Sequence, residues 1–73
     1  MSKLPVISGS ECAKALGKVG FLMSRQRGSH MILVRDNPRI TVSIPCHDSL
    51  DRGTLRSIIR QSGLSVEEFV RLL

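Results

Sequence analysis

The first apolar residues that recur at regular spacing along the chain indicate an amphipathic helix. The segment from Ser8 to Glu11 has the form of a capping box, with a hydroxyl at the N-cap and a carboxylate three residues later. Cys12, Leu16 and Val19 then fall on one helical face, and a glycine follows Val19. The pattern predicts a helix over residues 11–19.

The pattern then changes to the short period that is typical of strands. Residues 21–27, 30–35 and 39–45 form three extended runs, and in the last run apolar and polar residues alternate. Gly-Ser at 28–29 suits a two-residue hairpin turn, and residues 36–38 form a second turn cluster. The middle of the chain is therefore predicted to be a meander of three antiparallel strands.

The second of these strands has apolar residues on both faces. His30, Ile32 and Val34 share one face, and the residues between them, which include Met31 and Leu33, share the other. A strand of this kind is expected at the centre of a sheet that is covered on both sides. Helices can cover one side. A partner chain could cover the other, although exposed isoleucine and valine are also common on small sheets.

Two further helices are predicted in the last third of the chain. Asp51 can cap a helix over residues 52–62, which Gly63 would end, and a second capping box at 65–68 opens a short final helix. In the longer helix an inward stripe lies beside a basic stripe whose members are four residues apart. The inward stripe is Leu55, Ile58, Ile59 and Ser62, and the basic stripe is Arg52, Arg56 and Arg60.

These elements predict a small α+β domain with the order α-β-β-β-α-α. A chain of 73 residues has room for one domain, so residues 1–73 are expected to fold as a unit, with helices on one face of a three-stranded antiparallel sheet. Without the last short helix, the order is that of double-stranded RNA-binding domains. Such domains recognise the shape of RNA and its 2′-hydroxyl groups.

Composition narrows the class of protein. Apolar residues make up 41% of the chain, which is too many for a disordered segment, and no apolar run approaches the roughly 20 residues of a membrane span. Residues 1–7 lack the apolar stretch of a secretory signal, so a soluble cytoplasmic protein is expected. Because Trp and Tyr are absent and Phe21 and Phe69 are the only phenylalanines, a platform that stacks bases is not expected.

The positive charge favours a nucleic acid or an acidic protein as partner. The formal net charge is +5, and eight of the eleven cations are arginines, which suit bidentate contacts with phosphate. The simpler interpretation is that basic side chains keep the protein soluble and that the basic stripe is a solvated helix face. No carboxylate lies among the arginines of this helix, which favours a role in binding.

The two cysteines are not expected to form a disulfide framework. Cys12 is predicted to lie in the core and Cys46 near a strand end, both as free thiols. Together with His30 and His47 they could supply four zinc ligands. The only close pair in the sequence is Cys46 and His47, so neither a metal site nor a cofactor is predicted.

His30 is the strongest candidate for chemistry. It begins a strand directly after Ser29, with Arg25 and Arg27 on the preceding strand. An imidazole can accept and donate a proton near neutral pH, and guanidinium groups stabilise negative charge that develops on a phosphate. Cleavage of an RNA phosphodiester needs both the proton transfer and the stabilisation of this charge. A structural role for a strand histidine is the alternative.

His47 is a weaker candidate. It follows the third strand, before the loop that contains Asp48 and Asp51, and it could be a second proton-transfer group or a loop histidine that bonds to the backbone. No P-loop and no nucleophile elbow occur, and the two aspartates lack companions for a two-metal nuclease site. Chemistry is therefore expected to centre on His30.

Three segments of the chain resemble the sequence signature of HicA-type toxins. They are residues 20–30, which end in the Gly-Ser-His turn; residues 42–47, Val-Ser-Ile-Pro-Cys-His; and residues 52–64, which are similar to the family's G-T-L-R-x-I-x-R-Q-x-G segment. All three occur in order, and the resemblance extends from Leu4 to Leu73. HicA-type toxins are the small RNA-cleaving members of bacterial and archaeal toxin–antitoxin pairs.

The resemblance implies an activity, a partner and a site. It implies an endoribonuclease that acts on mRNA, and a cognate HicB-type antitoxin that blocks it. It also implies that His30 is the catalytic histidine, with a less certain, auxiliary role for His47. Arg27 fits the basic residue that often precedes the glycine of the turn in this family.

The leading interpretation is therefore a metal-independent endoribonuclease toxin in which His30 acts as general acid–base. A non-catalytic module that binds double-stranded RNA is the alternative, and a protein-interaction domain with an acidic partner is a third possibility. If an antitoxin docks on the uncovered sheet face, its interface should lie over His30, Ile32 and Val34. The residues expected to hold RNA are Arg25, Arg27, Ser29, Arg52, Arg56 and Arg60.

Overall fold

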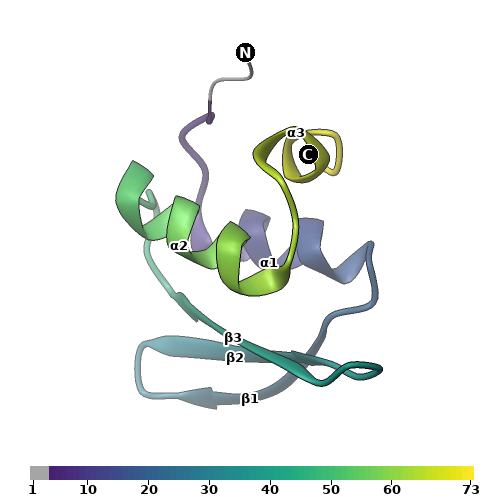
Figure 1. Cartoon of the computed structure of the whole chain (residues 1–73). Helices are drawn as coiled ribbons and strands as arrows, with labels where there is room; N and C mark the ends of the chain where they lie inside the picture. Colours follow the sequence, from purple (N-terminus) through teal and green to yellow (C-terminus); the bar gives the residue numbers. More distant parts are fainter. Residues whose placement is uncertain (1–3) are drawn as a thin grey trace.

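Three helices and three strands follow one another in the order that the sequence predicts. The computed structural model describes residues 4–73. The first three residues of the N-terminal segment, for which no secretory signal is predicted, lie outside the described part. None of the helices in the described part is long and apolar enough to cross a membrane. The elements are α1 (Gly9–Gly17), β1 (Leu22–Arg27), β2 (His30–Arg35), β3 (Ile40–Pro45), α2 (Arg52–Ser62) and α3 (Val66–Val70) (Figure 1).

Helix α1 begins and ends two residues before its predicted bounds. At its start, the Ser8 hydroxyl accepts a hydrogen bond from the Glu11 backbone N–H (3.1 Å), and the Glu11 carboxylate accepts one from the Ser8 N–H (3.0 Å). The predicted capping box is therefore confirmed. At its end, the N–H groups of Lys18 and Val19 donate to carbonyls three residues back, which tightens the last turn. The predicted end at Val19 is wrong, because Gly17 is the last helical residue.

The three strands form one antiparallel sheet in the order β1-β2-β3, which confirms the predicted meander. Arg27 pairs with His30 in the first hairpin, and Leu33 pairs with Val42 in the second. Strands β1 and β3 each start one residue later than the sequence pattern indicates. Phe21, which precedes β1, is buried, and the guanidinium of Arg35 lies 4.8 Å from the centre of its ring.

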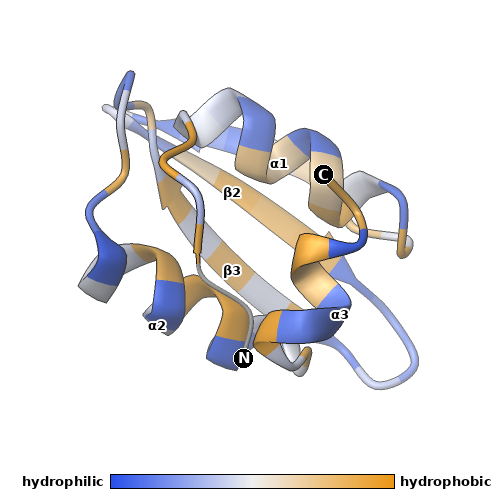
Figure 2. Cartoon of the chain, turned by 90° about the horizontal axis from the view of Figure 1, so that it is seen from above, coloured by the Kyte–Doolittle hydropathy of each residue, from blue (hydrophilic) through white to orange (hydrophobic). Residues whose placement is uncertain are grey.

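The sheet and a layer of helices enclose the core. Helices α1 and α2 lie on one face of the sheet, and α3 lies on the side of α1 and α2 that faces away from it (Figures 1 and 2). All four members of the predicted inward stripe of α2 are buried. Its polar member, Ser62, donates its hydroxyl hydrogen to the Ile59 carbonyl (2.7 Å), which satisfies the buried hydroxyl. The other helices and the strands contribute Cys12, Ala15, Leu16, Leu33, Val42, Ile44 and Phe69 to the same core.

The opposite face of the sheet carries no helix in the described part of the chain (Figure 1). The strand register places His30, Ile32 and Val34 on this side, together with their cross-strand neighbours. Every residue of β1 is exposed, and Leu22 is 74% exposed. We call this surface the outer face, and it comprises Leu22, Arg25, Arg27, His30, Ile32, Val34, Thr41 and Ser43.

The N-terminus of α1 lies against the end of β3. The Gly9 N–H donates a hydrogen bond to the His47 carbonyl (2.9 Å). Gly9 also lies so close to the Pro45 carbonyl that a Cβ atom at this position would overlap with the oxygen. Only glycine permits such a close approach of two backbones. The contact joins the first helix to the strand end beside the first hairpin.

Replacement of Gly9 by alanine should therefore destabilise the fold. We expect Gly9→Ala to lower the free energy of unfolding by about 1–3 kcal/mol, because the added methyl group pushes α1 away from β3. Gly17→Ala is the matched control, since an added Cβ there meets no atom within 4 Å. In a helix alanine is more favourable than glycine by about 0.5–1 kcal/mol. Urea unfolding measures both variants, and equal stabilities would contradict the role of Gly9.

Helix α2 begins at an aspartate cap, as predicted. The Asp51 carboxylate accepts a hydrogen bond from the Thr54 backbone N–H (2.7 Å). This bond lowers the pKa of Asp51, and further hydrogen bonds from the Thr54 hydroxyl and the Gly53 N–H and the charge of His47 act in the same direction. The helix therefore has a charged cap whose protonation state is coupled to folding.

The cap makes stability depend on pH in the acid range. Because the pKa of Asp51 is lower in the folded state, its contribution is present above the unfolded pKa of about 3.9 and is lost as the pH falls through the folded pKa. Asp51→Asn keeps a capping side chain without the charge. We expect its melting temperature to fall less than that of the wild type between about pH 5 and pH 2. Asp48→Asn, which removes a carboxylate that caps no helix, is the control; identical profiles for Asp51→Asn and the wild type would contradict the coupling.

Candidate active site

A two-residue turn places His30 at the end of the outer face. Gly28 has a φ of 60°, the left-handed value that a type II′ turn requires at its first central position, and Ser29 completes the turn. The predicted two-residue turn is therefore confirmed. Arg27 and His30 are the residues that it joins, and His30 is the exposed first residue of β2.

The turn is also tied to the end of β3. The Cys46 N–H donates a hydrogen bond to the Ser29 carbonyl (2.7 Å), and His30 pairs with Pro45. On the β1 side, His30 pairs with Arg27. Strand pairing on both sides fixes the backbone of His30, so its side chain starts from a defined position on the outer face.

Two arginines share this face with His30 because β1 contains a bulge. The register shifts between Met23 and Arg25, so that Arg25 pairs with Ile32 and Arg27 pairs with His30. Without the extra residue, strict alternation from Leu22 would turn both arginines to the opposite face. Directly opposed residues have Cβ atoms about 4.5–5.5 Å apart, which brings the Arg27 guanidinium within reach of a group at His30.

The two arginines are free to bind an anion. Within residues 4–73 there is one ion pair between side chains, in which a guanidinium nitrogen of Arg39 lies 3.0 Å from a carboxylate oxygen of Asp36. Neither Arg25 nor Arg27 is therefore neutralised by a carboxylate of the described chain, and both are exposed. Such guanidinium groups suit bidentate contacts with phosphate oxygens.

A hollow of about 440 Å³ lies between His30 and helix α2. We call it the α2 groove. The candidate site residues predicted from the sequence do not include the α2 side of this groove. Gly53, Ser57 and Gln61 recur every four residues along the helix, and this spacing could have indicated that they share one helix face. Besides His30, the groove is lined by Ser43, Pro45, Gly53, Thr54, Ser57, Ile58 and Gln61.

The basic stripe of α2 lies on another side of the helix. Arg56 and Arg60 line a separate hollow with Ser65 and Val66 at the start of α3, and no residue of the stripe lines the α2 groove. The structure therefore brings Arg25 and Arg27 to His30 but does not bring the stripe there. Its three arginines are exposed, so a contact with RNA away from His30 stays a prediction.

His47 and the cysteines lie outside this arrangement. His47 is exposed after β3, its carbonyl accepts from α1, and it does not line the α2 groove. Cys12 and Cys46 are free thiols, with Cys12 buried in the core and Cys46 directly after the end of β3, as predicted, and Cys46 is exposed. Burial raises the pKa of Cys12 to about 12, which keeps it a neutral core residue. Within residues 4–73, no group of three or more His, Cys, Asp or Glu side chains could hold a metal ion.

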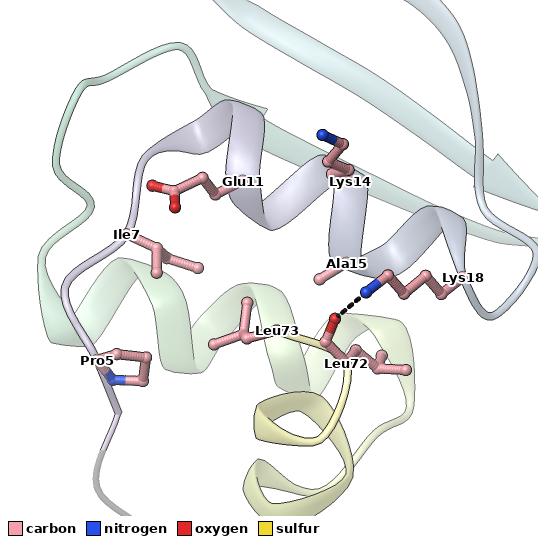
Figure 3. Close-up of a pocket in the computed structure, with 8 residues that line it drawn as sticks. All are labelled: Pro5, Ile7, Glu11, Lys14, Ala15, Lys18, Leu72 and Leu73. Atoms are coloured by element: carbon pink, nitrogen blue, oxygen red, sulfur yellow. Dashed lines mark hydrogen bonds between the residues drawn. The ribbon is translucent and has the colours of Figure 1, made fainter.

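An apolar hollow on the helical side of the molecule is a less suitable candidate for an active site. Its walls are the N-terminal segment, α1 and the last two residues, and the Lys18 ammonium donates a hydrogen bond to the Leu72 carbonyl (2.7 Å) (Figure 3). No histidine or cysteine lines it. The hollow lies where the C-terminal end of the chain packs against α1.

Comparison with protein-family models identifies the family of the chain. The family model of the HicA toxin of bacterial toxin–antitoxin systems matches residues 9–64. A search of curated proteins returns no match. The matched segment runs from the first residue of α1 to the residue after the C-cap of α2, so it includes the hairpin of His30 and both walls of the α2 groove. The resemblance noted in the sequence is thereby confirmed, and the chain belongs to the HicA toxin family.

Proposed function

We propose that this toxin is an endoribonuclease that cleaves mRNA at a site centred on His30, with residues 1–73 acting as one unit in the cytoplasm. The observation that carries the proposal is the exposed His30 beside Arg25 and Arg27 on the outer face, in a chain of the HicA family. Cleavage of a phosphodiester requires proton transfer, which the imidazole of His30 can supply. It also requires stabilisation of the negative charge that develops on the phosphate, which the two guanidinium groups can supply.

The reaction begins at the 2′-hydroxyl beside the scissile phosphate. Neutral His30 accepts the hydroxyl proton, and the 2′-oxygen attacks the phosphorus atom. The bond between phosphorus and the 5′-oxygen then breaks, and the 5′-oxygen takes a proton from the imidazolium. The products are a 2′,3′-cyclic phosphate and a 5′-hydroxyl, and His30 returns to its neutral form.

The arginines stabilise the charge that develops during this step. Arg27, opposite His30, and Arg25, two pairs further along the sheet on the same face, can donate to the two non-bridging oxygens of the phosphate. Ser29 adds a hydroxyl at the turn. Because guanidinium groups supply the positive charge, we propose a reaction that is independent of metal ions. The exposed stripe Arg52, Arg56 and Arg60 would hold phosphates further along the strand.

We further propose that a HicB-type antitoxin blocks the toxin by covering the outer face. This face carries the candidate active site and the half-buried side chains of Ile32 and Val34, and no helix of the described chain protects it. A partner that docks there would bury apolar side chains and exclude RNA in the same contact. Acidic residues on that partner would complement Arg25 and Arg27.

The first test is removal of the imidazole. We expect His30→Ala to lose RNA cleavage and growth inhibition by a factor of at least about 100, the lower range for a general acid–base, while its far-UV circular dichroism stays unchanged. The wild type should keep full activity in EDTA. Full activity in His30→Ala would contradict the assignment. RNA binding without product in the wild type would favour the non-catalytic RNA-binding module.

His47 provides a second variant for the same assay. Since His47 lies outside the α2 groove, we expect His47→Ala to cleave RNA at a rate within a few-fold of the wild type. A loss as large as that of His30→Ala would make His47 a second proton-transfer group.

The antitoxin surface is tested by a substitution on the outer face. Ile32→Ser removes apolar surface at the centre of this face, and we expect it to weaken antitoxin binding about tenfold or more. Glu67→Ser, at an exposed position of α3, is the control and should bind as the wild type does. Calorimetric titration measures both. Hydrogen-exchange protection that avoids β2 in the complex would contradict this docking surface.

A further inference from the structure

The α2 groove differs from the arginine side of His30 in its charge. Apart from His30 itself, every residue that lines it is uncharged. A groove that follows phosphates is expected to be lined by Lys or Arg. His30 therefore separates a charged side, formed by Arg25 and Arg27, from a neutral side formed by α2 and the end of β3.

The neutral side presents hydrogen-bonding groups in a fixed arrangement. The Gln61 amide donates to the Ser57 hydroxyl oxygen (3.2 Å), which orients both side chains on the exposed surface of α2. This bond leaves the second amide hydrogen and the carbonyl oxygen of Gln61, and the hydroxyl hydrogen of Ser57, available to a ligand. Thr54 also lines the groove and places its hydroxyl-bearing side chain beside them.

Apolar atoms form another part of the lining. Ile58 is 2% exposed and Pro45 is buried, so both present only a small apolar surface to the groove. A flat ligand with polar edges fits such a lining, because its face can contact the apolar atoms while its edge bonds to Gln61 and Ser57. The volume of about 440 Å³ also lies within the range of small-ligand sites.

We propose that the α2 groove binds the base of an unpaired nucleotide adjacent to the scissile phosphate, and that Gln61 and Ser57 determine the preferred base. This inference rests on the proposed ribonuclease function. The phosphate lies at Arg25 and Arg27, and the base turns to the opposite side of His30. The base must be unpaired, because in a duplex its hydrogen-bonding edge is already occupied by its partner.

The experiment compares cleavage sites on one long transcript. The cut positions of the wild type, Gln61→Ala, Ser57→Ala and Ser10→Ala are mapped by sequencing the new 5′ ends. Ser10 is exposed on α1 and serves as the matched serine control. We expect the wild type and Ser10→Ala to share a base preference beside the cut. Gln61→Ala should reduce that preference about fivefold or more while still cutting the transcript, and Ser57→Ala should change it in the same direction.

A binding measurement separates this inference from the proposed function. His30→Ala is titrated with short oligoribonucleotides that differ in one base, as single strands and as duplexes. We expect tighter binding of one single-stranded base variant, and loss of that difference when Gln61→Ala is added. Unchanged cut sites and unchanged base discrimination in Gln61→Ala would overturn the inference while leaving the ribonuclease intact. A wild type that cleaves no RNA would overturn the proposed function, and a base discrimination that Gln61→Ala removes would then still support a site for an unpaired base in the α2 groove.

Discussion

Two backbone hydrogen bonds at the chain segment after β3 join the first helix to the hairpin that carries the candidate site. The Cys46 N–H donates to the Ser29 carbonyl in the first hairpin, and the His47 carbonyl accepts from the Gly9 N–H at the start of α1. Consecutive residues thus bind the turn that carries His30 on one side and the first helix on the other. Gly9 permits this contact, because any side chain there would meet Pro45.

This segment lets a small core support an exposed site. The buried side chains lie between the helices and the inner face of the sheet, whereas His30, Arg25 and Arg27 lie on or beside the uncovered face. The groups proposed for chemistry therefore contribute little to the core, and Ile58 is the core residue that lines the α2 groove. Substitutions at the site can change activity without removing buried apolar surface.

His30 lies on a boundary between two kinds of surface. The guanidinium groups of Arg25 and Arg27 lie on its β1 side, and neutral hydroxyl and amide groups lie on its α2 side. A nucleotide has the same division, with a charged phosphate at one end and a neutral base at the other. The basic stripe of α2 is separate from both surfaces, so the positive charge of the chain is spread over separate regions of its surface.

The helices, strands and turns could be predicted from the sequence, because each depends on residues that are neighbours along the chain. Both capping boxes, the aspartate cap, the Gly-Ser turn and the inward stripe of α2 are local patterns, and the structure confirms them. His30 was likewise a candidate from its place after the turn and from the resemblance to HicA-type toxins. Tertiary structure alone decided which side chains surround it. The bulge in β1 turns Arg25 towards the outer face, and the packing of α2 beside β3 brings Ser57 and Gln61 to His30 while directing Arg56 and Arg60 towards α3. Strand register and helix rotation depend on contacts between residues far apart in the chain, and no local pattern encodes them.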